Sequence, residues 1–104
     1  MAFDPALAEA LRAALADRDD VEEKAMFGSR SFMVAGSLRI GANRDGGLFL
    51  KARPDRIADL LDLPGVAPML MKGRPMSIGW ITVDRTALTT DADLAFWLDE
   101  ALPT

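Results

Sequence analysis

The fold is decided by residues 26–36, which read MFGSRSFMVAG. Within this stretch four apolar residues, Phe32 to Ala35, stand between the turn-forming Gly28 and Gly36. An apolar run of this length between turn residues is typical of a strand that is buried on both faces. We therefore expect residues 32–35 to form a central strand, onto which later hairpins and helices pack.

Amphipathic patterns predict a helix near each end of the chain. Asp4 and Pro5 suit an N-cap and a first helical position, and an apolar stripe follows at four-residue spacing. Near the other end, Thr90 and Asp93 resemble a capping box. The apolar stripe of that helix consists of Leu94, Trp97, Leu98, Ala101 and Leu102.

The residues between these helices predict strands and one short helix. Residues 32–35 and 38–42 form a hairpin, and its expected turn is Gly36–Ser37, because an Ala35–Gly36 turn would put alanine at positive φ. A third strand is expected at residues 48–52, and a short helix begins at Pro54. A second hairpin is expected from residues 69–71 and 76–83, with Phe32 and Trp80 in the core.

This order of elements predicts one α+β domain over residues 1–104. The order is helix, three strands, helix, two strands, helix. We expect two layers: a mainly antiparallel five-stranded sheet with helices packed on one side. The sheet has six strands if residues 21–27 form a strand rather than an extended lead-in.

The composition argues against an enzyme. The chain has no histidine, cysteine or tyrosine, so the usual acid/base group, thiol nucleophile and zinc ligands are missing. The acidic residues 17–23 and 91–93 lack the glycine that a calcium loop needs at its sixth position. We expect no catalytic, cofactor or metal site. Without a signal peptide or an apolar span, a cytoplasmic protein is expected, with no membrane partner.

The charge is divided along the chain. Residues 1–23 and 84–104 are acidic, whereas residues 24–83 carry an excess of basic side chains. Blocks of like charge along a chain usually indicate solvent-exposed faces, and we favour that interpretation. The alternative is weak nucleic-acid binding through a basic sheet face. Its candidate residues are Arg30, Arg39, Arg44, Lys51, Arg53, Lys72 and Arg74.

A rival hypothesis is a surface that binds protein. Three methionines, Met69, Met71 and Met76, cluster around the second predicted hairpin, and flexible thioethers suit surfaces that accept varied partners. Phe96 lies off the apolar stripe of its helix, so its ring is expected at the surface. The partner is unknown, and a second copy of the chain is one form of this hypothesis. Core methionines that fill gaps explain the same pattern about equally well.

Three separated motifs carry a family resemblance. They are residues 26–36, Gly73-Arg74-Pro75-Met76 leading into residues 80–84, and the closing Leu94 to Leu102 segment. In order and spacing they resemble the N-terminal domain of the TfoX/Sxy regulators of bacterial competence. Ser29 and Ala35 depart from the glycine and asparagine that are common in that family. The resemblance implies the same α+β architecture and a role in transcription regulation, although the second domain of longer TfoX proteins is missing.

Overall fold

The structure is a computed structural model that describes residues 4–26, 28–43, 46–71, 73–75, 79–88 and 90–102. Within these residues it contains three α-helices, one 3-10 helix and eight strands. The helices are α1 (Pro5–Ala14), α2 (Ile57–Leu61), η1 (Arg85–Ala87) and α3 (Asp91–Ala101). The strands are β1 (Val21–Met26), β2 (Ser29–Val34), β3 (Ser37–Ala42), β4 (Leu48–Lys51), β5 (Val66–Pro68), β6 (Leu70–Met71), β7 (Arg74–Pro75) and β8 (Trp80–Val83).

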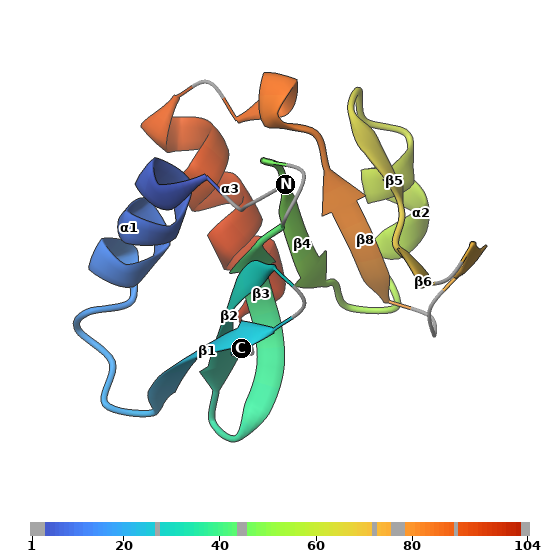
Figure 1. The fold of residues 1–104 in the computed structure, drawn as a ribbon. Coiled ribbons are helices and arrows are strands. Elements are labelled where there is room, and N and C mark those ends of the chain that lie inside the picture. The colour runs from blue at the N-terminus through green and yellow to red at the C-terminus, as the bar shows by residue number, and fades with distance from the viewer. Residues whose placement is uncertain are drawn as a thin grey trace.

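Six of the strands form one antiparallel sheet in the order β1-β2-β3-β4-β8-β5 (Figure 1). Strands β1 to β4 follow one another in the chain and pair with their neighbours, whereas β8 inserts between β4 and β5. Residues 21–26 are a strand, so the sheet has the sixth strand that the sequence left open. The predicted α+β class is confirmed.

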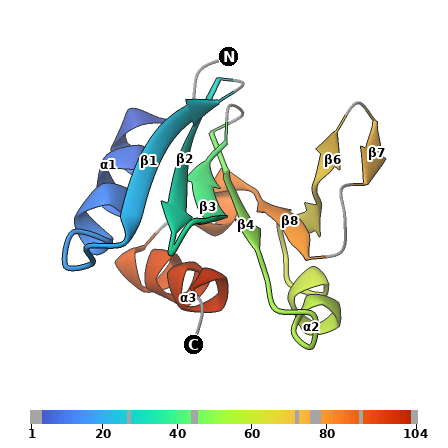
Figure 2. The same ribbon diagram turned by 90° about the horizontal axis from the view of Figure 1, so that it is seen from below.

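The core lies between the sheet and the helices on one of its faces. Ile40, Leu50 and Ile81 are cross-strand neighbours in the centre of this face, and each is at most 1% exposed. Leu11 of α1 and Trp97 of α3 belong to the same buried cluster. Figure 2 shows α1 and α3 on one side of the strands, as the two-layer prediction requires.

Both predicted helix caps are present. The Asp4 carboxylate accepts a hydrogen bond from the Ala6 N–H at 2.9 Å, with Pro5 in the first turn. At the start of α3, the Thr90 hydroxyl accepts from the Asp93 N–H at 3.1 Å, and the Asp93 carboxylate accepts from the Thr90 N–H at 3.2 Å. These bonds satisfy donors that the first helical turn leaves without partners.

The turn of the β2–β3 hairpin differs from the prediction. Val34 pairs with Ser37, so the two turn residues are Ala35 and Gly36 rather than Gly36 and Ser37. Their φ values are +55° and +85°, and two positive φ values are the mark of a type I′ turn. A type I′ turn matches the twist of the strands that it joins, and this match offsets the backbone strain of Ala35 at positive φ.

The second predicted hairpin is also wrong in detail. The strand that pairs with β8 is β5, at residues 66–68, whereas residues 70–71 and 74–75 form a separate two-stranded sheet. Val66 supplies the apolar side chain that packs against the core, and Pro68 is tolerated because β5 is an edge strand. Helix α2 begins at Ile57, since residues 54–56 form a turn instead of the predicted first helical residues.

The face of the sheet that the helices leave uncovered carries a second, smaller apolar group. Strand alternation puts Ile81 and Val83 in the core, so Trp80, which we expected in the core, lies on the opposite face and is half-buried. Its ring centroid is 6.2 Å from that of Phe49, which is 3% exposed. The Phe49 ring lies over Gly41 of the neighbouring strand, where a side chain would collide with it.

Candidate interaction surfaces

A buried glutamate organises the last turn of α3. Glu100 is 7% exposed, and its carboxylate accepts hydrogen bonds from the Arg56 guanidinium at 2.9 and 3.2 Å. Arg53 approaches the same carboxylate at 3.6 Å. The hydrogen bonds and charge of Glu100 raise the pKa of Arg56 above its usual value. Arg53, predicted to contact polyanions, is therefore bound to an internal acid.

Arg39 also contacts the end of α3. The pairing of β2 with β3 steps from Phe32–Ile40 to Met33–Leu38, so Arg39 is left over as a bulge. A bulge redirects the side chain it carries. The Arg39 guanidinium donates to the Ala101 carbonyl at 2.9 Å, where a cation is favoured by the helix dipole.

Arg30 belongs to a third cluster, between α1 and β1. Glu23 accepts two hydrogen bonds from Arg12, at 2.6 and 2.7 Å, and lies 3.4 Å from the Arg30 guanidinium. The Arg12 hydrogen bond is the largest cause of a lowered pKa at Glu23, with the charges of both arginines adding to it. This cluster fixes α1 to the edge of the sheet through charge-assisted bonds.

The described basic residues do not form one surface. Arg30, Arg39 and Arg53 contact groups on the helix side of the sheet. Lys51 pairs with Trp80 in register and is exposed on the other face. Arg44, Lys72 and the side chain of Arg74 lie outside the described residues. Nucleic-acid binding by these residues stays a prediction.

The predicted protein-binding residues are likewise separated. Phe96 is 40% exposed on α3, and its ring meets Trp97 edge-on with centroids 4.9 Å apart. Met69 is half-buried beside β8, where its N–H donates to the Trp80 carbonyl at 3.0 Å. Figure 2 shows α3 and β6, the strand after Met69, on opposite sides of the sheet. Met76 and the side chain of Met71 lie outside the described residues.

A hollow that the sequence did not predict lies between the first turns of α1 and α3. Its volume is about 760 Å³, and η1 forms its third wall. The lining combines the apolar Leu7, Leu88 and Leu94 with the polar ends of Asp4 and Arg85. No sequence signal could have found it, because its walls come from three segments that only the fold brings together.

The described residues offer little that could hold a metal ion. Among residues 4–26, 28–43, 46–71, 73–75, 79–88 and 90–102, no three acidic side chains come together as a metal site. The acidic residues singled out by the sequence act locally instead: Asp20 bonds to Arg18, and Asp93 caps α3. Within the same described part of the chain, no helix is long and apolar enough to cross a membrane.

Comparison with known protein families gives a match over most of the chain. The family model for the TfoX N-terminal domain matches residues 13–104. That range contains all three motifs on which the resemblance was based. Neither the curated proteins nor the solved structures gave a match. The family is regulatory in type and is not known as an enzyme family. Because the match covers most of the chain, this protein belongs to the TfoX N-terminal domain family.

Proposed function

We propose that this chain is a non-catalytic regulatory or adapter domain of the bacterial cytoplasm, which acts in transcription regulation through contacts with a protein partner. Membership of the TfoX N-terminal domain family supports a role like that of competence regulators. The absence of histidine, cysteine and tyrosine from the sequence leaves few groups suited to catalysis near neutral pH.

The observation that carries this proposal is the exposure of Phe96. The ring is 40% exposed, although α3 has a buried stripe beside it that holds Trp97 and Leu98. Its edge-on contact with Trp97 holds the ring in place before any partner binds. A fixed exposed aromatic loses little side-chain entropy on binding, and aromatic residues are enriched among those that dominate binding energy.

Nucleic-acid binding is the alternative, and it has weaker support. A surface that binds phosphates needs several cations free to face the same way. Arg39 and Arg53 instead contact the end of α3, and Arg30 contacts Glu23. Lys51 is exposed on the other face of the sheet, and a single lysine gives little affinity for a polyanion.

Affinity capture from the native cell lysate separates the two hypotheses. The tagged domain is used as wild type, as Phe96→Ala and as Leu63→Ala, each with and without nuclease. Leu63 is a matched control because it is the other exposed large apolar residue of the described chain, at 39%. We expect a stoichiometric protein that survives nuclease and is lost with Phe96→Ala but not with Leu63→Ala.

Two other outcomes contradict the proposal. Captured material that is lost after nuclease treatment supports the nucleic-acid alternative. A protein partner that Phe96→Ala retains as well as the wild type shows that the contact lies elsewhere. Circular dichroism of each variant confirms that the substitutions have not unfolded the domain.

A further inference from the structure

Strand β1 is a long open edge of the sheet. Its six residues pair with β2 on one side, and no other described strand pairs with it. Figure 1 shows β1 at the bottom of the molecule, below α1. The opposite edge, β5, is only three residues long and contains Pro68, which has no N–H to donate. Of the two edges, β1 is therefore the one suited to accept another strand.

The register shows which backbone groups of β1 face outward. Residues of an antiparallel pair alternate between those that bond to the partner strand and those that point away from it. The Ala35 N–H donates to the Asp20 carbonyl at 2.9 Å, so Asp20 bonds toward β2. The unbroken register then makes Glu22 and Lys24 bond toward β2 as well. The N–H and C=O groups of Val21, Glu23 and Ala25 point to the open edge.

We propose that β1 pairs with β1 of a second copy of this chain, antiparallel, about a two-fold axis at Glu23. Such an axis can pass between the two copies of any residue from Val21 to Ala25, because bonded and non-bonded pairs alternate along an antiparallel ladder. A centre at Glu22 or Lys24 opposes that charged residue directly to its own copy, which is repulsive. The charges choose among them. A centre at Val21 opposes Glu22 to Asp20 of the other copy, and a centre at Ala25 opposes Lys24 to an uncharged Met26.

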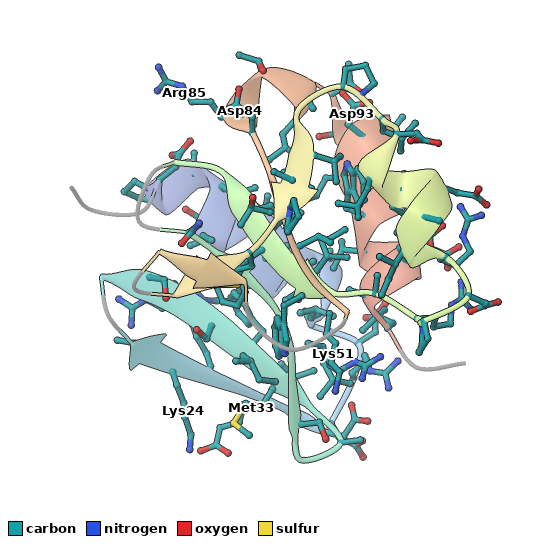
Figure 3. The ribbon with its side chains drawn as sticks, turned by 90° about the vertical axis from the view of Figure 1, so that its right-hand side faces the viewer. Lys24, Met33, Lys51, Asp84, Arg85 and Asp93 are labelled. Carbon is teal, nitrogen blue, oxygen red and sulfur yellow. The ribbon has the colours of Figure 1, made fainter. Side chains whose placement is uncertain are left out.

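The centre at Glu23 makes the exposed charges of the edge complementary. Glu22 of each copy then lies directly opposite Lys24 of the other, on the face without helices. These side chains are 68% and 47% exposed and lie 3.8 Å apart within one chain, so the dimer joins two such pairs into an alternating group of four charges. Opposite charges facing each other across strands stabilise the pairing. Figure 3 shows Lys24 projecting from this face beside Met33.

The two Glu23 residues at the axis are compensated by groups already in place. Each carboxylate is bound by its own Arg12 at 2.6 and 2.7 Å and approached by its own Arg30 at 3.4 Å. Each glutamate is therefore already paired with arginine of its own chain, which offsets the repulsion between the two carboxylates. Beside this point, a hollow of about 240 Å³ between the end of α1 and β1 leaves room for side chains of the added strand.

Two six-residue edges bury less than the roughly 1,600 Å² of a standard interface, so we expect a reversible dimer with a micromolar dissociation constant. Sedimentation equilibrium over about 1 µM to 1 mM brackets this range. The wild type should pass from 11.2 kDa to twice that mass. Glu22→Lys and Lys24→Glu each turn two attractive pairs into repulsive ones and should weaken the dimer by about tenfold.

The double variant that carries both substitutions restores complementary pairs and should recover the wild-type dissociation constant. Ala25→Pro removes an outward N–H without touching a bond to β2 and should give a monomer. Phe96→Ala should leave the dimer unchanged, so a failure of this proposal can be distinguished from a failure of the proposed function.

A wild type that stays monomeric at all concentrations overturns the proposal. So does a dimer that ignores the charge reversals, or one that the double variant fails to restore.

Discussion

Replacing Gly41 by alanine tests the packing of the sheet face without helices. A Cβ atom at this position would lie 2.4 and 2.5 Å from two carbons of the Phe49 ring and 2.7 Å from the Arg30 carbonyl oxygen. Carbon atoms in contact prefer about 3.5–4.0 Å, so the ring must move by about 1 Å or more. The Arg30 carbonyl belongs to the backbone of β2 and cannot move away without disturbing the β2–β3 pairing.

The cost follows from what Phe49 loses. Its side chain is 3% exposed, and full burial of a phenylalanine is worth about 1.5–3 kcal/mol. With the strain on the strand pair added, we expect Gly41→Ala to lower the free energy of unfolding by about 3 kcal/mol. For a domain of this size that lowers the melting temperature by roughly 15 °C. Urea unfolding followed by tryptophan fluorescence measures the change directly.

Gly36→Ala is the matched control for this experiment. A Cβ atom at position 36 would have no neighbour within 4 Å, but the residue has a φ of +85°, so the cost is backbone strain alone, about 1–2 kcal/mol. In a Phe49→Ala background, Gly41→Ala should cost clearly less than in the wild type, because the ring is gone. The reasoning is refuted if Gly41→Ala costs no more than Gly36→Ala.

Three further substitutions test other features. Ala35→Asn should raise the unfolding free energy by about 0.5–1 kcal/mol, because asparagine tolerates the positive φ at this turn position; urea midpoints measure it. Thr90→Ala should lower it by about 1 kcal/mol through loss of the capping box, whereas Thr90→Ser should not. The pKa of Glu23 is lowered in the folded state, so its contribution is present above the unfolded-state pKa and is lost as the pH falls through the folded-state value. Glu23→Gln should therefore lose less stability than the wild type between about pH 7 and pH 3, and equal losses would contradict this.

Local signals in the sequence were reliable where the structure depends on nearby residues. The caps at Asp4 and Thr90 and the apolar stripe of α3 follow from spacings of a few residues, and all are present. The predicted turn at Gly36–Ser37 was wrong because the turn must match the twist of both strands, and this requirement outweighed the local preference of Ala35 for negative φ. The prediction that Trp80 lies in the core was wrong because an aromatic residue does not indicate which face of the sheet it occupies until the register is known.

The clusters around Glu23 and Glu100 were beyond sequence reasoning for a different reason. Glu100 bonds to Arg56, 44 residues away, and Arg39 reaches Ala101 across 62 residues. No periodicity links such positions. The only signal was Glu100 itself, a charge three residues after Trp97 at the margin of an apolar stripe, which indicates a buried acid in need of a partner. Of its two arginine partners, Arg53 was predicted to contact polyanions and Arg56 was not singled out.

The contacts of α3 with residues 39, 53 and 56 also have a consequence for folding during synthesis on the ribosome. A ribosome delivers all six strands of the main sheet before it delivers this helix. Until then, the apolar face around Ile40, Leu50 and Ile81 lacks the ring of Trp97, and contacts between distant segments form slowly. A chain that has completed β8 but not yet α3 therefore exposes part of this apolar face, and it is prone to aggregate until α3 packs on the sheet.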